Sequence, residues 1–424
     1  MSPNLKGRLS RLRELGLAPA SEVARRPESR PGGRERPSGS GGAASREAGA
    51  ALSRGPGDGP SFLQGWERLC DLVWARTLRF GLAFPESLDS RPFDLARLAR
   101  ERKGRAGRLE GGPPEGESRI AREELRLLDF ETSGLSGGAG TVAFLAAVGS
   151  LDADGLSVRQ FFLEDYPGEA GYLEALVAEL LGGAVVLTYN GRAFDLPLLR
   201  TRCVMNGMAP PLLRDLDALA SSRRLWKSVL GGASLGLLER EVLGAERELD
   251  VPGAAIPGIW FEYLRKGDHP LMGAVMSHNA YDISTLASIA ARIDSAFAAP
   301  RRHAASSAVD RAGLGRGLLV MGKASEGEEL LEAAAADGDE AAGLFLSRRY
   351  RREGRPGDRR RVLDLLPSTY VSSVERAKFH EHSARDLAEA RRWAGKAERL
   401  ASTEEESAAV AARIARLERK AGRG

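Results

Sequence analysis

The chain has 424 residues, of which 42% are hydrophobic, and this is enough for two or three folded domains. Its 62 basic and 58 acidic residues leave a small positive surplus, which suits an anionic partner but supports nucleic-acid binding only weakly. Long apolar runs are absent and the N-terminus is charged, so we expect a soluble, cytoplasmic protein without a membrane span. The two cysteines, Cys70 and Cys203, are far apart and suggest neither a disulfide framework nor a zinc site, so any metal would bind oxygen ligands.

Residues 1–60 are predicted to be largely disordered and basic. From residue 20 to residue 60 the chain is rich in glycine, proline, serine, alanine and arginine and shows no hydrophobic periodicity. Such a composition cannot bury enough apolar surface to offset the entropy of ordering the chain. The segment could bind phosphate groups loosely, but a solvated spacer is the more ordinary use of this composition, and we favour it.

Residues 61–118 are predicted to form a short helical extension followed by a linker. Apolar side chains recur at helical spacing between residues 62 and 82, and we expect this helix to pack on the next domain. These side chains are Phe62, Trp66, Leu69, Val73 and Leu78. A polar, glycine-rich stretch at 101–118 then separates the extension from the part of the chain that carries the candidate chemistry.

Residues 119–295 are predicted to form an α/β domain, with a mixed β-sheet flanked by helices. Apolar runs of strand length and helical patterns follow one another in the order strand, strand, strand, helix, strand, helix. The predicted strands lie at 125–131, 141–151, 157–166 and 184–190, and a helix is expected to begin near Phe194. This order of elements is typical of a mixed α/β sheet.

Residues 305–424 are predicted to form an all-α region. The sequence is rich in alanine, glutamate and arginine and contains amphipathic segments such as GEELLEAAAADGDEAAGLFLSRRYRREG. Pairs of such helices with small residues at their contacts are typical of a short tetratricopeptide-like (TPR-like) array. The repeat is too degenerate for its units to be counted, and a plain helical bundle explains the pattern almost as well.

The first candidate catalytic residues are Asp129 and Glu131, in the strand predicted at 125–131. Residues two apart on a strand point to the same face, so these two carboxylates lie side by side. Adjacent carboxylates repel each other unless a cation lies between them, and hard oxygen ligands suit Mg²⁺ or Mn²⁺. An isolated D-x-E is more often the solvated end of a strand, so this motif alone does not establish a site.

A second candidate is Asp195, near the start of the helix that follows the strand at 184–190. A carboxylate in this position is commonly a structural helix cap. The preceding residues suggest substrate binding, because Asn190 and Gly191 permit close approach of another backbone and Phe194 offers an aromatic ring to a base. Each also has a structural explanation, a turn for the first two and core packing for the third.

The third pair of candidates, His278 and Asp282, lies on a helix predicted at 277–293. Their separation of four residues places both on one helical face. Such a pair is more often a local hydrogen bond than a catalytic unit. A metal-binding carboxylate with a histidine one turn away to accept a proton from water is nevertheless a chemically complete arrangement.

Together the three motifs resemble the DEDD pattern of the ribonuclease-H-like exonucleases, and in particular their YprB-like branch. The resemblance rests on LLDFETSGLSGGAGTVAFLAAVG, on TYNGRAFDLPLLRTR and on the segment from RRLWKSVLGG to MSHNAYDISTLA, within residues 125–290. It implies a ribonuclease-H-like fold and metal ligation by four carboxylates, those of Asp129, Glu131, Asp195 and Asp282. It also implies that the helical C-terminal region is the TPR-like tail of that family.

By the same resemblance, His278 is the residue that would orient or deprotonate water. Many histidine-type members place this residue five positions before the last aspartate, whereas here the gap to Asp282 is four, the spacing of the tyrosine-type subclass. His278 therefore occupies the tyrosine-type position. Tyr281, adjacent to Asp282, would point elsewhere on the helix and is the poorer base candidate.

The function that this resemblance implies is a metal-dependent 3′-to-5′ exonuclease that hydrolyses phosphodiester bonds with two Mg²⁺ or Mn²⁺ ions. Nucleic acid is the expected partner, with DNA favoured, and the family suggests a role in DNA repair with a helicase as protein partner of the tail. Two alternatives remain open: a non-catalytic nucleic-acid-binding module that has kept the fold, and a scaffold protein that works through its TPR-like tail. The presence of all four carboxylates favours the enzyme.

Overall fold

The structure, a computed structural model, divides into two compact units. It describes residues 61–104, 118–134, 140–247 and 250–422. The predicted disordered segment, 1–60, lies outside the described residues. Unit 1 comprises the chain up to Leu82, Glu123–Asp215 and Glu246–Ser284, and unit 2 comprises Ala83–Arg122, Leu216–Ala245 and Thr285–Gly424.

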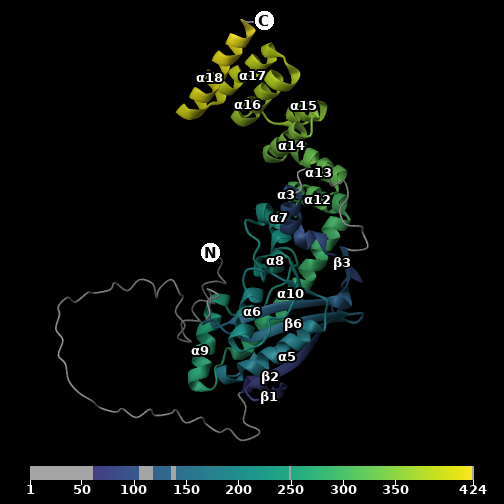
Figure 1. The fold of residues 1–424 in the computed structure, drawn as a ribbon, viewed down its shortest axis with the longest axis vertical. Coiled ribbons are helices and arrows are strands. Elements are labelled where there is room, and N and C mark those ends of the chain that lie inside the picture. The colour runs from purple at the N-terminus through teal and green to yellow at the C-terminus, as the bar shows by residue number, and fades with distance from the viewer. Residues whose placement is uncertain (1–60, 105–117, 135–139, 248–249, 423–424) are drawn as a thin grey trace, which may run out of the picture. The chain divides into compact units, whose positions relative to one another are not determined.

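A seven-stranded mixed sheet forms the centre of unit 1, as the sequence predicts (Figure 1). Its order is β1-β2-β7-β6-β5-β8-β9. The strands are β1 (Glu67–Cys70), β2 (Val73–Phe80), β5 (Leu125–Thr132), β6 (Ala143–Asp152), β7 (Gly155–Leu163), β8 (Val185–Thr188) and β9 (Arg214–Asp217). β5, β6 and β7 are joined directly and pair antiparallel, whereas β8 follows a helix and pairs parallel with β5.

Helices cover both faces of this sheet. α5 and α6 pack on one face in a core that contains Phe161, Leu173 and Leu199, and α9 and α10 pack on the other around Phe144 and Trp260. The helices are α5 (Glu169–Leu181), α6 (Asp195–Met205), α9 (Ile256–Lys266) and α10 (Met272–Ala298), with the 3₁₀ turns η1 (Ser61–Leu63), η3 (Arg122–Glu124), η4 (Tyr166–Gly168) and η5 (Gly253–Ala255). Because neighbouring side chains on a strand point to opposite faces, every second residue of β5 points towards α10.

The segment 62–82 does not form the helix that its hydrophobic spacing predicts. It forms β1 and β2 after the η1 turn, and β2 pairs antiparallel with β7 along its whole length. Its apolar residues fit both periods, since Val73 and Ala75 are fully buried while Trp74 and Arg76 point to the opposite face. Pairing with the edge of β7 selects the strand over the helix. Because β7 lies about eighty residues further along the chain, a local stretch of sequence does not contain this information.

Unit 2 is mainly helical. Its two-stranded antiparallel sheet consists of β3 (Ser87–Asp89) and β4 (Arg119–Ala121). The helices that precede the C-terminal region are η2 (Arg91–Asp94), α3 (Leu95–Gly104), α7 (Leu219–Leu230) and α8 (Leu235–Glu241). α3 is the helical part of the segment predicted as an extension, and within unit 2 it packs with α7 and α12.

The C-terminal region is helical, as predicted for 305–424, and its helices follow one another in chain order (Figure 1). They are α11 (Pro300–Ala304), α12 (Arg311–Met321), α13 (Ala324–Ala336), α14 (Glu340–Arg352), α15 (Pro356–Leu365), α16 (Tyr370–Phe379), α17 (Leu387–Leu400) and α18 (Glu404–Ala421). Small residues do lie at a helix contact: a Cβ on Gly315 would meet the Gly327 carbonyl at 2.9 Å, and one on Gly327 the Gly315 carbonyl at 2.7 Å. Consecutive helices of this region therefore pack closely as pairs.

A π-helical turn, η6 (His380–Ala384), joins α16 to α17 and holds an ion cluster. The Glu381 side chain is fully buried and accepts hydrogen bonds from three cations of α18, those of Arg413, Arg416 and Lys420, at 2.7–3.0 Å. Burial opposes ionisation of this carboxyl, but the hydrogen bonds from Arg416 and Lys420 outweigh it and hold the pKa of Glu381 at about 2. One carboxylate thus ties the last helix to the turn.

The two compact units differ from the single domain predicted for 119–295. The sheet begins with β1, upstream of that range, and Leu216–Ala245 belongs to unit 2, where α7 packs with η2, α3 and α12. α10 belongs to unit 1 as far as Ser284 and to unit 2 beyond it. Among the described residues, no helix combines the length and the apolar character that a membrane crossing requires.

Candidate active site

The first two predicted carboxylates lie on β5, an interior strand of the sheet between β6 and β8. Asp129 and Glu131 are two residues apart and point to the face that α10 covers. Asp129 pairs across the strands with Ala147, and Glu131 pairs with Leu145. Glu131 is 9% exposed and Asp129 is partly buried, so neither is the solvated strand end that an isolated D-x-E more often is.

Asn279, on α10, holds the Asp129 carboxylate. Its side-chain amide donates a hydrogen bond of 2.9 Å to Oδ2 of Asp129 and one of 3.2 Å to the Asp129 carbonyl oxygen. Asn279 is itself completely buried. A buried donor restrains the carboxylate oxygen that accepts its hydrogen bond, so Asn279 limits the directions in which the Asp129 carboxylate can point.

His278 and Asp282 face Glu131 from the neighbouring turns of α10. The His278 Nε2 atom lies 3.6 Å from Oδ2 of Asp282 and 3.9 Å from Oε1 of Glu131. The structure therefore brings together two motifs that are about 150 residues apart in the sequence. The other ring nitrogen, Nδ1, lies 2.6 Å from Oδ1 of Asp250, which accepts its proton and so leaves Nε2 to face the carboxylates.

Arg247 supplies a cation to the same cluster. It donates a hydrogen bond of 2.5 Å to Oδ1 of Asp282, and its second terminal nitrogen lies 3.2 Å from Nδ1 of His278. The Arg247 side chain is only 9% exposed, and its guanidinium lies 5.8 Å from the centre of the Tyr281 ring. The carboxylate of Asp282 is thus paired with an internal arginine.

Burial and neighbouring negative charges oppose ionisation of two of these carboxyl groups, those of Glu131 and Asp129. Burial raises the pKa of Glu131 to about 8, against the opposing charge of His278. Burial also raises the pKa of Asp129 well above its ordinary value. The other carboxylates raise the pKa of Asp129 further, and these are Asp282, Glu131 and Asp195.

Asp195 belongs to this cluster through its charge. It is the first residue of α6, and its charge raises the pKa of both Asp129 and Glu131. α6 follows β8, the parallel neighbour of β5, so the start of α6 lies next to the end of β5 at which the carboxylates project. All four predicted ligands thus belong to one electrostatic group.

The turn between β8 and α6 carries the residues predicted to bind substrate. Asn190 adopts a positive φ of 69°, and a Cβ on Gly191 would lie 2.5–2.6 Å from the Thr188 side chain, so only glycine fits there. Phe194 is 51% exposed, which rules out the core packing that was its structural alternative. An exposed ring therefore stands directly before Asp195.

The pKa of His278 is also shifted by its surroundings. On its own, burial would lower the pKa of His278, but the hydrogen bond with Asp250 and the charges of Asp282 and Glu131 raise it above its ordinary value. The acidic groups that surround the imidazole therefore favour its protonated form.

The donor chemistry fits a hard divalent cation, although the side chains are not yet arranged around one. Among the described residues, no group of three or more histidine, cysteine, aspartate or glutamate side chains is placed to hold a metal ion as it stands. In this arrangement the Asp282 carboxylate accepts a hydrogen bond from Arg247, and Asp129 accepts one from Asn279. The four predicted ligands offer only carboxylate oxygens, and oxygen is the donor atom that Mg²⁺ and Mn²⁺ prefer.

Comparison with known proteins agrees with this fold. The RNase_H superfamily profile matches residues 127–293. YprB, an uncharacterised protein of Bacillus subtilis strain 168, is 30% identical over 318 residues, which are 70% of this chain and 75% of YprB. The chain belongs to the YprB-like branch of the RNase H superfamily.

A solved structure with some likeness to this YprB-like protein is the family B DNA polymerase of the archaeon Pyrobaculum calidifontis. The likeness is distant, with 16% identity and a TM-score of 0.31, and covers half of this chain. It spans only 29% of the polymerase chain. We therefore draw nothing about function from it.

Three polar residues of the site in this YprB-like protein were not predicted from the sequence. They are Asn279, Arg247 and Asp250. Asn279 could have been found, since it stands three residues before Asp282 and so shares its helical face. Arg247 and Asp250 lie in an irregular segment without periodicity, where the sequence gives no sign of which side chains turn inwards.

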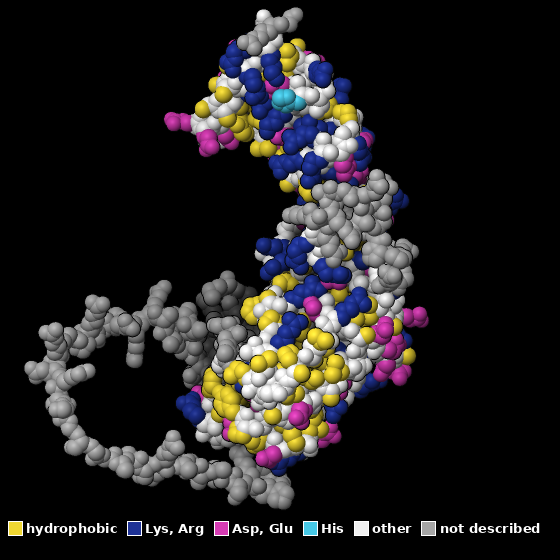
Figure 2. All heavy atoms as spheres, viewed as in Figure 1, with side chains coloured by type: hydrophobic (Ala, Val, Ile, Leu, Met, Phe, Trp, Pro, Cys, Tyr) yellow, Lys and Arg dark blue, Asp and Glu magenta, His cyan; other side chains and the backbone are white. Residues whose placement is uncertain are grey.

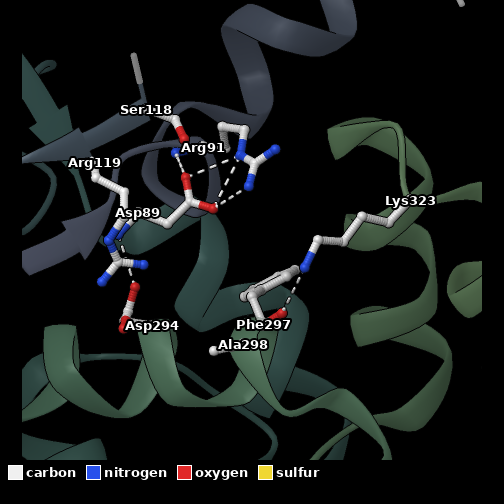
Figure 3. Close-up of a pocket in the computed structure, with 8 residues that line it drawn as sticks. All are labelled: Asp89, Arg91, Ser118, Arg119, Asp294, Phe297, Ala298 and Lys323. Atoms are coloured by element: carbon white, nitrogen blue, oxygen red, sulfur yellow. Dashed lines mark hydrogen bonds and ion pairs between the residues drawn. The ribbon is translucent and has the colours of Figure 1, made fainter. Parts of the chain in front are cut away.

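A polar cavity of about 180 Å³ in unit 2 is a structural cluster rather than a second site (Figure 3). Arg91 forms a bidentate pair with Asp89, through Nε to Oδ1 and Nη2 to Oδ2, and Asp294 accepts a hydrogen bond of 2.8 Å from the Asp89 backbone. Lys323 donates to the Phe297 carbonyl at 3.3 Å. These contacts tie β3 to α10, and α10 to the residue before α13, so the cluster has a structural role without a ligand.

Proposed function

We propose that this YprB-like protein is a metal-dependent 3′-to-5′ exonuclease that hydrolyses phosphodiester bonds of nucleic acid, with DNA favoured. The observation that carries the proposal is the grouping of Asp129, Glu131, Asp195 and Asp282 in one electrostatic cluster beside His278. The ribonuclease-H-like fold supports hydrolysis of nucleic acid. Direction, exonucleolytic mode and the preference for DNA rest on the family resemblance.

The four carboxylates would hold two Mg²⁺ or Mn²⁺ ions. When bound, such ions activate water and stabilise the charge that develops on the phosphate and leaving oxygens. Asp129, in the middle of β5, would be the central ligand of this set, because the charges of the other three carboxylates all act on it. Asn279 orients this ligand through the hydrogen bond to Oδ2.

His278 is the proposed group that orients water or takes its proton. Asp250 accepts the Nδ1 proton at 2.6 Å, which fixes the tautomer whose Nε2 atom can receive a proton. That Nε2 atom faces Glu131 and Asp282 at 3.9 and 3.6 Å. Asp250 thus acts on the imidazole as an orienting carboxylate does in other acid–base pairs.

The turn between β8 and α6 is the proposed substrate-binding edge. Asn190 and Gly191 keep the backbone compact there, and the exposed Phe194 ring can stack on a nucleotide base beside Asp195. Stacking of this kind tolerates any base sequence, because every base has an aromatic face.

The C-terminal helices are proposed as a TPR-like region that binds a protein partner, such as a helicase in DNA repair, or positions the substrate. Their close pairing through small residues supports the repeat interpretation. Lysine and arginine side chains gather on the face of these helices drawn in Figure 2. Such a surface suits an acidic or phosphate-bearing partner.

The deciding experiment uses the purified full chain with end-labelled single- and double-stranded DNA and RNA, with Mg²⁺, Mn²⁺ or chelator. We expect shortening from the 3′ end with either ion, and none with chelator. Asp129→Asn and Asp195→Asn should abolish hydrolysis, while Asp154→Asn, an exposed turn substitution on the same sheet, should leave it unchanged. Full activity in either of the first two variants would overturn the assignment.

One observation favours a second candidate, a non-catalytic nucleic-acid-binding module. Arg247 pairs with Asp282 inside the cluster. A guanidinium in this position can serve as the permanent counter-ion of the carboxylate, so that no metal ion binds there. In that case the wild-type chain should bind labelled nucleic acid equally well with Mg²⁺ and with chelator, and should cut none of it.

A further inference from the structure

Four residues from four strands lie in one row across the sheet. Arg76 of β2 is directly opposite Gln160 of β7, Gln160 is opposite Ala147 of β6, and Ala147 is opposite Asp129 of β5. Residues opposite one another across paired strands point to the same face. The row lies on the face that α10 covers. It leads from β2, in the N-terminal hairpin formed by β1 and β2, to Asp129, the first candidate carboxylate.

The row has a gap, and α10 fills it. Gln160 and Asp129 are two strands apart, roughly 9.5 Å from backbone to backbone, which is too far for a direct hydrogen bond. Ala147 between them is fully buried and carries no polar group. Asn279 lies over it, and its amide reaches Gln160 on one side and Asp129 on the other.

The hydrogen bonds form one continuous chain. Arg76 Nε donates to Gln160 Oε1 at 2.7 Å, and Gln160 Nε2 donates to Asn279 Oδ1 at 3.0 Å. Asn279 Nδ2 then donates to Asp129 Oδ2 at 2.9 Å. Gln160 Nε2 also donates to the Met276 carbonyl at 2.8 Å, which anchors the chain to α10.

The direction of this chain is set at its arginine end. A guanidinium has only donors, so the end of Gln160 that meets Arg76 must be its oxygen, and its nitrogen must face Asn279. By the same logic Asn279 presents its oxygen to Gln160 and its nitrogen to Asp129. With either amide reversed, two donors would face each other at one of its ends and two oxygens at the other, and reversal of Asn279 would also leave the Asp129 carboxylate without its donor.

We propose that Arg76 is a positioning residue for the candidate metal centre, which it reaches through Gln160 and Asn279 by fixing the donor that holds Asp129. The inference rests on the proposed function in so far as Asp129 binds a metal ion. It also extends the site to β2, which lies outside the range that the sequence motifs cover. The guanidinium of Arg76 also makes a cation–π contact with Trp66, with its carbon 4.7 Å from the ring centre, and this contact helps to hold Arg76 in place.

The test compares three substitutions on β2 in the full chain. Arg76→Met keeps the length of the side chain but removes its donors, whereas Arg76→Lys keeps a group that can only donate. Arg79→Met is the matched control. Arg79 is exposed, lies near the end of β2 and pairs with Asp152 at the end of β6. Gln160→Leu breaks the chain at its next link and serves if Arg76→Met does not fold.

The first readout is the Asn279 amide itself, in metal-free protein. The chain has four asparagines, Asn4, Asn190, Asn206 and Asn279, so ¹⁵N-asparagine labelling gives four side-chain amide signals, and Asn279→Ser assigns the one needed. In the wild type, Arg76→Lys and Arg79→Met we expect this amide to exchange slowly with solvent. In Arg76→Met and Gln160→Leu it should shift and exchange faster.

The second readout is Mn²⁺ affinity by calorimetry. We expect Arg76→Met to weaken binding at least about tenfold, the usual effect of losing a group that orients a metal ligand, and Arg76→Lys to restore most of it. Wild-type affinity and an unchanged Asn279 signal in Arg76→Met would overturn the inference. A wild-type chain that binds no Mn²⁺ while its Asn279 signal still responds to Arg76→Met would instead overturn the proposed function.

Discussion

The Arg247 guanidinium donates a 2.5 Å hydrogen bond to the Asp282 carboxylate, the last member of the acidic cluster. The same arginine lies within 3.8 Å of Asp250 and approaches the His278 ring. A charge-assisted hydrogen bond between partly buried groups is one of the stronger contacts available to a side chain. An ion that binds Asp282 must therefore compete with Arg247.

Replacing this arginine by methionine should have opposite effects on the metal-free and the metal-bound protein. Arg247→Met should lower the melting temperature without metal, because the carboxylates lose a counter-ion. It should raise Mn²⁺ affinity about tenfold, the equivalent of the ~1.5 kcal/mol that a hydrogen bond to a charged group contributes. Calorimetry and thermal unfolding measure the two, with the exposed Arg200→Met as control. Weaker Mn²⁺ binding in Arg247→Met would show that the arginine helps to hold the ligands.

His278 should matter for turnover far more than for folding. His278→Ala should reduce the rate by about 10²–10⁴-fold, the usual contribution of a positioned proton acceptor, while Mn²⁺ affinity stays near that of the wild type. Asp250→Asn should give a smaller loss in the same direction, since the imidazole keeps its place but loses the partner that fixes its tautomer. Single-turnover rates measure both, against the exposed His382→Ala. Turnover within a few fold of wild type in His278→Ala would exclude the base role.

The exposed ring before Asp195 should contribute to substrate binding and not to chemistry. Phe194→Ala should raise the KM for a single-stranded oligonucleotide about tenfold with little change in kcat, because stacking on one base contributes ~1–3 kcal/mol. Phe261→Ala, which removes a comparably exposed phenylalanine from α9, is the control. An unchanged KM in Phe194→Ala would place the substrate elsewhere.

The ion cluster at Glu381 predicts an acid-sensitive C-terminal region. The pKa of Glu381 is about 2 in the folded protein, against an ordinary value of 4.5. The stability that this carboxylate contributes is therefore complete above pH 4.5 and is lost as the pH falls from there towards 2. The shift corresponds to roughly 3 kcal/mol at neutral pH. Glu381→Gln should lower the stability of the last helices at pH 7, and the difference from wild type should vanish near pH 2. Circular dichroism during thermal unfolding at both pH values measures this, and an equal difference at both would contradict it.

The sequence predicts those parts of the site that have a strict spacing. Asp129 and Glu131 share a face because strands repeat every two residues, and His278 and Asp282 share one because helices repeat every three to four. Arg247 reaches the cluster from an irregular segment, where no period constrains the direction of a side chain. Its role depends on tertiary packing, which a sequence window does not contain.

The N-terminal hairpin shows the same limit for the fold. Phe62, Trp66, Leu69 and Val73 fit a helical period as well as Val73 and Ala75 fit a strand, so the sequence alone leaves two answers. The choice is made by β7, whose edge needs a partner. The C-terminal helices, by contrast, are predicted well, because their periodicity is long and local and needs no distant partner.

The pairing of β2 with β7 also decides how this protein can be cut into fragments. A fragment that begins at residue 119, just before the motifs, would leave eight consecutive residues of β7 without their hydrogen-bonding neighbour. A bare inner strand of this length is a template for the same strand of another molecule, so such a fragment should self-associate into sheets. Its insolubility or inactivity would then report an exposed sheet edge and say nothing about the chemistry of the carboxylates.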